Sequence, residues 1–265
     1  MLYRPMMTPA QCSASAHYVA QSARLSLHPQ AVALWDDPAP PEAIRPVTSL
    51  GTPIALCQGL ALVKREGKTV YMERTDHSCW NPMVWLGLGE ITPGSPAFFA
   101  IRDRLGIRDP EKAAELLRSF PVLPVHQGIL MGPAETCSFR PDVILFPCDN
   151  NFQLRFFLMA IKHETGALLQ TTLDPIDSCM HTIAEPILTG DYGIAIPDPG
   201  DQERALSGSN ETILAVPISR LEELERGCRY WRERGAGYED FHPQMQLAFS
   251  QPPFYQALFQ FWNVR

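Results

Sequence analysis

The stretch Pro29-Gln-Ala-Val-Ala-Leu-Trp35 is a short apolar run that predicts a buried strand. A second run with the same outline, Pro141-Asp-Val-Ile-Leu-Phe146, lies in the later half of the chain. Each run precedes a predicted helix, over 53–65 in the first case and over 151–164 in the second. Both helices are followed by a glycine, the residue that most often ends a helix. The same strand and helix therefore occur twice, in the same order.

The repeated order continues beyond these two helices. In each copy a second strand follows the helix, then a Ser-Cys pair, then an apolar segment that closes at a glycine, then a last strand. In the first copy the second strand is 69–72, the cysteine is Cys79, the closing glycine is Gly89 and the last strand is 128–133. In the second copy these features are 167–170, Cys179, Gly190 and 212–217. Cys79 and Cys179 take equivalent places in the two copies.

This pattern predicts an α/β (or α+β) fold with a mixed sheet flanked by helices. We expect two diverged βαβ-containing repeats related by pseudo-two-fold symmetry. The alternative is that unrelated βαβ units reuse the same prolines and glycines at their ends. The expected division is an N-terminal helix in 1–28, a first half in 29–137, a second half in 138–228 and an aromatic-rich C-terminal extension in 229–265.

The extension has no counterpart in the repeats and is rich in aromatic residues. We expect it to pack on the core, because large aromatic side chains are most often buried. A binding surface or a homodimer contact is the second interpretation. The aromatic residues are Tyr230, Trp231, Tyr238, Phe241, Phe249, Phe254, Tyr255, Phe259, Phe261 and Trp262.

Charge and hydropathy exclude several classes of partner. The chain has 22 basic and 29 acidic residues, a net charge of −7, and its basic residues are scattered, so we expect no nucleic-acid partner. No apolar stretch approaches the ~20 residues that span a bilayer, so we expect no membrane partner. The first seven residues lack a secretory pattern, and the seven cysteines lack the spacing of a disulfide scaffold. These features predict a cytoplasmic protein.

Three cysteines are the strongest candidates for chemistry. Cys79 and Cys179 each stand just before a predicted helical segment, where backbone N–H groups lower a thiol pKa, and Cys57 lies on the first helix of the first half. Three thiolates suit a metal ion or an iron–sulfur cluster, and a cluster held by three cysteines keeps one iron open. Their spacing matches no CxxC motif, and ordinary buried cysteines are an equally good interpretation.

Acidic and imidazole side chains accompany the paired cysteines. Asp76, His77 and Asp177 are candidates for proton transfer or for orienting ligands. Capping of a helix is an equally good interpretation of Asp76 and Asp177. The chain contains no P-loop, Rossmann, nucleophile-elbow or HExxH motif, which argues against those enzyme classes.

At these residues the chain resembles the domain-of-unknown-function 169 family of archaea and bacteria. The resemblance covers roughly residues 25–225 and implies a shared fold and a shared cysteine pattern, but no named activity. Many members carry a further cysteine in a Gly-Cys-x-x-x-Arg segment, whereas Asp191–Gly200 here has none. The resembling stretches are Cys57–Gly67, Tyr71, Asp76-His-Ser-Cys79, Leu86–Gly89, Phe139–Ile144, Gly166, Cys179 and Val216-Pro-Ile218.

The first functional hypothesis is a redox protein or enzyme in which Cys57, Cys79 and Cys179 hold an iron–sulfur cluster, such as a 4Fe-4S cluster, between the two halves. It would act on a small molecule and, if redox-active, need an electron donor. The second hypothesis is a non-catalytic small-molecule-binding or accessory protein with a cleft between the repeats. The sequence does not decide whether the protein is an enzyme.

Overall fold

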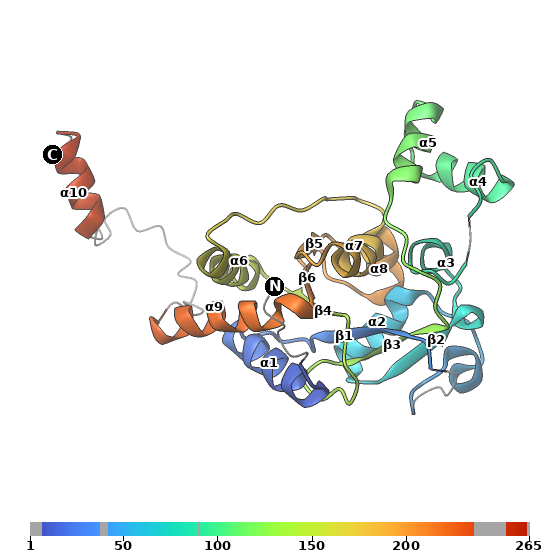
Figure 1. Cartoon of the computed structure of the whole chain (residues 1–265), viewed down its shortest axis with the longest axis horizontal. Helices are drawn as coiled ribbons and strands as arrows, with labels where there is room; N and C mark the ends of the chain where they lie inside the picture. The colour runs from blue at the N-terminus through green and yellow to red at the C-terminus, as the bar shows by residue number, and fades with distance from the viewer. Residues whose placement is uncertain (1–6, 38–41, 90, 236–252, 264–265) are drawn as a thin grey trace.

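One sheet of six strands forms the centre of the protein in the computed structural model, which describes residues 7–37, 42–89, 91–235 and 253–263 (Figure 1). The strands lie side by side in the order β2-β3-β1-β4-β6-β5. Their bounds are β1 (Gln30–Trp35), β2 (Val70–Glu73), β3 (Gly128–Pro133), β4 (Val143–Cys148), β5 (Gly193–Ala195) and β6 (Thr212–Pro217).

All neighbouring strands in this sheet are antiparallel, so the prediction of a mixed sheet is wrong. Helix α2 (Leu56–Glu66) connects β1 to β2, but β3 lies between these two strands and pairs with both. In the second half, β6 lies in the same way between β4 and β5. The connected strands are parallel to each other without being neighbours, which is a split βαβ arrangement.

Helices cover both faces of the sheet. Alternate residues of β4 show this: Val143 and Leu145 belong to the core under α2, whereas Ile144 and Phe146 belong to the core under α1 (Pro9–Ser22), α6 (Asn151–Thr165) and α9 (Leu221–Glu233). Side chains of a strand alternate between its faces, so a sheet covered on both sides needs continuous apolar runs. This explains why β3 and β4 are buried along their whole length.

Most of the remaining helices lie around the face of the sheet that α2 covers. Helices α4 and α5 project away from the sheet and pack against each other (Figure 1). The bounds are α3 (Trp80–Trp85), α4 (Pro96–Arg104), α5 (Pro110–Ser119), α7 (Glu185–Thr189), α8 (Pro199–Ala205) and α10 (Pro253–Phe261), with short turns at Pro46–Leu50, Arg74–Asp76, Met180–Ala184 and Ile218–Arg220. No helix among the described residues is long and apolar enough to cross a membrane.

Most predicted elements are confirmed, with one clear exception. The expected strand at 167–170 is wrong: this segment has no regular structure, and Leu168 is 75% exposed. The strand that follows α6 in the sheet is β5, whose Ile194 N–H donates to the Thr171 hydroxyl. The run at 167–170 is short and lacks the alternation of a half-buried strand, so its apolar residues were not sufficient evidence for a strand.

The aromatic extension divides into two described parts. Trp231 belongs to α9 and packs against the core that lies under α1, α6 and α9. Its indole N–H donates to the Met159 carbonyl at 2.9 Å. In α10 no residue is buried, and Phe261 is 80% exposed. Tyr238, Phe241 and Phe249 lie outside the described residues.

A buried ion pair ties α2 to the second half. The Lys64 ammonium contacts the Glu211 carboxylate, with side chains only 5% and 3% exposed, and also the Ser207 hydroxyl at 3.0 Å. The other Glu211 oxygen accepts the Gly208 N–H at 3.2 Å. Both charges are therefore paired and hydrogen-bonded, the condition under which a buried ion pair is tolerated.

We predict that Lys64→Met lowers the free energy of unfolding by about 3–5 kcal/mol, because it leaves the Glu211 charge buried and unpaired. Urea denaturation measures the change. The double variant Lys64→Met/Glu211→Leu should recover most of the loss, since it removes both charges. A loss below about 1 kcal/mol in the single variant would contradict the role given to this pair.

Asp142 fixes the point where β1 and β4 separate. Its carboxylate accepts the Leu34 N–H at 2.8 Å, its own N–H donates to Val32, and its carbonyl accepts the Ile218 N–H. Burial raises the pKa of Asp142 above its usual value, although the Leu34 hydrogen bond opposes this. The folded state therefore binds the Asp142 proton more tightly than the unfolded state does.

The raised pKa of Asp142 predicts the direction in which the stability of the protein changes with pH. The stabilising contribution of the protonated Asp142 is complete below the unfolded pKa of about 3.9 and is lost as the pH rises through the folded pKa. Asp142→Asn keeps an acceptor for Leu34 and removes the titration. Between pH 4 and 7 the wild type should therefore lose more stability than the variant. Urea denaturation at several pH values measures this, and parallel pH profiles would count against it.

Candidate functional site

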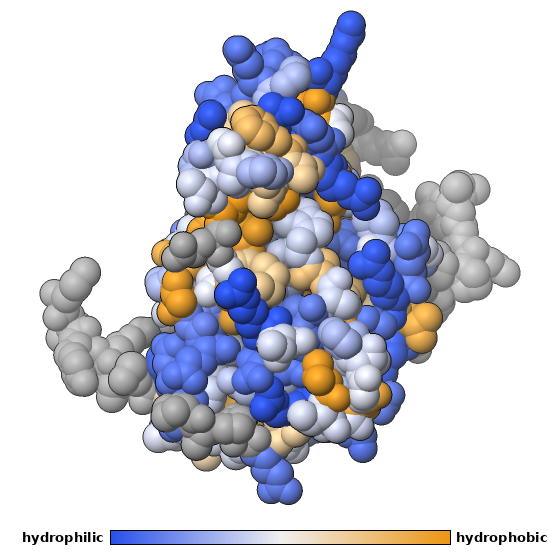
Figure 2. Space-filling view, turned by 90° about the vertical axis from the view of Figure 1, so that its right-hand side faces the viewer, coloured by the Kyte–Doolittle hydropathy of each residue, from blue (hydrophilic) through white to orange (hydrophobic). Residues whose placement is uncertain are grey.

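A pocket of about 730 Å³ lies between α2, α3, α4 and α8. Figure 2 views the molecule from the side of α3, α4 and α5 and shows apolar side chains gathered below the projecting top of the molecule. Both halves of the chain contribute to the pocket wall. The lining residues are Leu56, Cys57, Ser78, Cys79, Trp80, Asn81, Pro82, Ala97, Ala100, Ile101, Arg104, Ile176, Ser178, Cys179, Asp198, Pro199, Gly200, Glu203 and Arg204.

The first half brings Cys57 and Cys79 to this pocket. Ile54 and His77 form an isolated parallel bridge, in which the Ile54 N–H donates to Asp76 and the Ser78 N–H donates to Ile54. Cys57 then falls in the first turn of α2, and Cys79 is the residue before α3. A local backbone pairing therefore holds the two thiols near each other.

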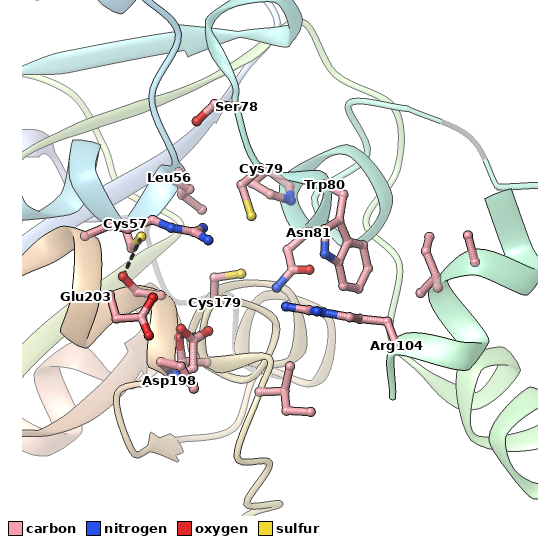
Figure 3. A pocket seen from close by; sticks show the side chains of 18 of the residues that line it. Leu56, Cys57, Ser78, Cys79, Trp80, Asn81, Arg104, Cys179, Asp198 and Glu203 are labelled. Atoms are coloured by element: carbon pink, nitrogen blue, oxygen red, sulfur yellow. Dashed lines mark hydrogen bonds between the residues drawn. The ribbon is translucent and has the colours of Figure 1, made fainter. Parts of the chain in front are cut away.

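The second half brings Cys179 to the same pocket, because its neighbour Ser178 is held by the N-terminal turn of α8. The Ser178 hydroxyl contacts Asp198 at 3.2 Å and donates to Asp201, and both carboxylates belong to the N-terminal turn of α8. Helix α8 packs on α2, and the Cys57 thiol lies 3.7 Å from the Gly200 carbonyl oxygen. Figure 3 shows Cys57, Cys79 and Cys179 around one space.

Burial keeps two of these thiols protonated. It raises the pKa of Cys57 to about 12, with Asp201 and Asp198 adding to the effect. It also raises the pKa of Cys179 well above its usual value, with Asp177 next in importance. The expectation that a helix start lowers the thiol pKa is therefore wrong for the Cys179 segment, because burial and nearby carboxylates outweigh the backbone.

The spacing of these donors does not suit a single metal ion. Within the described part of the chain, no group of three His, Cys, Asp or Glu side chains is arranged to hold one. The structure thus gives no support to a mononuclear site formed by Cys57, Cys79 and Cys179.

Asp177 lies behind the pocket wall and is hydrogen-bonded to Asn81, one of the lining residues. It is fully buried, and one carboxylate oxygen accepts the side-chain N–H of Asn81 at 2.7 Å. Burial raises the pKa of Asp177 to about 6, with Asp174 adding to the effect and the Asn81 hydrogen bond opposing it. Asp177 therefore reaches the pocket through Asn81.

Asp76 and His77 do not line the pocket. The Asp76 carboxylate is fully buried and accepts the N–H groups of Val47 and Glu73, at 2.9 and 3.1 Å, while Arg45 lies beside it. These contacts match the capping interpretation. Burial lowers the pKa of His77 to about 4, so its ring is neutral at physiological pH.

Sequence reasoning missed several polar residues of the pocket, namely Asn81, Arg104, Asp198, Glu203 and Arg204. Asn81 stands two residues after Cys79, so the resembling segment could have indicated it. Arg104 had no such signal, because α4 reaches the pocket only through tertiary packing. The other four cysteines, Cys12, Cys137, Cys148 and Cys228, belong to the core on the opposite face of the sheet.

Comparison with known proteins gives a family but no activity. No curated protein and no solved structure matches the chain. The model of an uncharacterised family, DUF169 (Uncharacterised ArCR), matches residues 19–227, which include every strand of the sheet and every lining residue of the pocket. The chain belongs to this family.

Proposed function

We propose that this pocket binds an iron–sulfur cluster through Cys57, Cys79 and Cys179, and that the protein is a redox protein or enzyme acting on a small molecule there. The observation that carries the proposal is the meeting of these three cysteines at one pocket. They come from segments far apart in the chain, while the other four lie on the opposite face of the sheet.

A cluster suits this donor set better than a single ion does. Cysteine sulfurs around a cluster stand farther apart than sulfurs around one ion, because the cluster lies between them. The cluster would supply electron transfer or an open iron site. Ligation would require the three thiols to lose their protons, and the cluster irons would offset the negative charge of the resulting thiolates.

The protein residues around such a cluster would have distinct tasks. Asp177, Asp198 and Glu203 would hold or move protons near the bound molecule, and Asn81 and Arg104 would orient it. We expect Asp76 and His77 to act only through the segment that carries Cys79. A redox role also calls for an electron donor, and free thiols in all seven cysteines fit a cytoplasmic setting.

The second candidate function is binding of a small molecule without catalysis. The pocket volume of about 730 Å³ falls in the range of ordinary ligand sites, and the raised thiol pKa values describe unreactive cysteines. In this case the thiols would be part of the pocket wall only. Iron and sulfide content separates the two functions.

We also propose that the two halves descend from one duplicated unit. The sheet order β2-β3-β1 in the first half and β5-β6-β4 in the second, read from each edge to the centre, supports this. Cys79 and Cys179, at equivalent places, meet at the pocket. The cluster would then sit near the axis that relates the halves, and a homodimer is not needed to complete the site.

We predict that protein purified without oxygen contains stoichiometric iron and sulfide and absorbs broadly near ~400 nm. Cys57→Ser, Cys79→Ser and Cys179→Ser should each lose most of the iron and the absorption, because each removes a ligand. Colorimetric iron and sulfide assays with a visible spectrum measure this.

Cys228→Ser and Cys12→Ser are the matched controls, since both change a buried cysteine on the opposite face of the sheet. They should keep the iron and the spectrum. Colourless, iron-free wild type with a cooperative unfolding transition would refute the cluster and favour the binding function. Equal loss in pocket and control variants would also count against it.

A further inference from the structure

We propose that the pocket binds a small hydroxy acid, with Arg104 on its carboxylate and the side-chain oxygen of Asn81 accepting its hydroxyl. This inference rests on the proposed function only in treating the pocket as the small-molecule site, and it does not require the cluster. It names the chemical class of the ligand. Two side chains carry it, each with hydrogen-bonding capacity that the protein leaves unused.

Asn81 holds an unpaired acceptor within the pocket wall. Its side chain is 7% exposed, and its amide N–H donates to the Asp177 carboxylate at 2.7 Å. When Asp177 is ionised, above its pKa of about 6, the amide keeps its N–H toward the carboxylate, because the reverse orientation would set two acceptors against each other. The Asn81 oxygen is buried and has no hydrogen-bond partner among the described residues. A buried acceptor left unpaired is costly, so a ligand that donates an N–H or O–H here gains affinity.

Arg104 brings a cation to the same pocket. It ends α4 and, in Figure 3, its guanidinium extends toward the side chain of Asn81. Within the described ranges Arg104 has no hydrogen bond or ion pair, whereas Arg102 on the same helix pairs with Asp103 at 2.6 Å. A guanidinium matches a carboxylate with two parallel hydrogen bonds.

The rest of the pocket suits the carbon skeleton of such a ligand. Trp80, Ile101 and Ile176 give it apolar walls, and the volume of about 730 Å³ accepts a molecule larger than the acid group alone. A cation and a hydrogen-bond acceptor in one pocket suit a carboxylate ligand that also carries a hydrogen-bond donor, and a 2-hydroxy acid is the simplest such molecule. We favour a hydroxyl as that donor, because the Asn81 oxygen offers a single acceptor and a hydroxyl donates a single hydrogen bond.

Isothermal titration calorimetry with three matched probes tests this inference. The probes are 2-hydroxy-3-phenylpropanoate, 3-phenylpropanoate, which lacks the hydroxyl, and 2-hydroxy-3-phenylpropanamide, which lacks the charge. We expect wild type to bind the hydroxy acid at least about fivefold more tightly than either analogue, as one lost hydrogen bond of about 1 kcal/mol or more requires. Arg104→Gln should weaken the hydroxy acid about tenfold and leave the neutral amide unchanged. Arg102→Gln, on the same helix, is the control and should bind as wild type does.

Equal affinity for the three probes, absence of binding, or equal effects of Arg104→Gln and Arg102→Gln would overturn the inference. The comparison of probes uses wild type, so it tests the role of the Asn81 oxygen without a substitution at Asn81. Iron and sulfide measured in the same preparation report on the cluster separately. Iron-free protein that prefers the hydroxy acid would refute the cluster and retain the ligand class, and iron-containing protein without that preference would do the reverse.

Discussion

The pairing of β1 with β4 is the constraint on which the rest of the structure depends. Three residue positions, from Gln30–Leu145 to Val32–Val143, join the two halves into one sheet. Beyond Val32 the strands separate, and the Asp142 carboxylate takes the Leu34 N–H that β4 no longer satisfies. A backbone N–H in this position needs such a partner, because an unpaired one in a buried sheet is costly. The junction is therefore short but complete in its hydrogen bonds.

A single sheet with both faces covered determines where the functional groups meet. Helix α2 and the segment that begins at Cys179 lie on the same face, one from each half. The Lys64–Glu211 pair and the packing of α8 on α2 then fix the distance between them. The three pocket cysteines thus share a wall for reasons of topology, whichever chemistry they serve.

The sequence predicted most elements of this fold but not their neighbours in the sheet. The glycines that follow α2 and α6 marked the ends of these helices closely, because such signals act within a few residues. The insertion of β3 between β1 and β2 left no local signal, since strand order is settled by long-range packing. For the site, Cys57, Cys79 and Cys179 were found from their place in the pattern. Asn81 and Arg104 were missed, because their importance lies in hydrogen-bonding capacity that only the folded structure reveals.

The pocket wall comes from both halves of one cooperative sheet, and this links occupancy to the whole molecule. Any molecule that binds only the assembled wall favours the native state by mass action, to a degree set by its concentration relative to its dissociation constant. The midpoint of thermal unfolding then becomes a property of the protein together with its surroundings. Material from a medium rich in the natural ligand would resist heat and proteases better than the same chain after exhaustive dialysis.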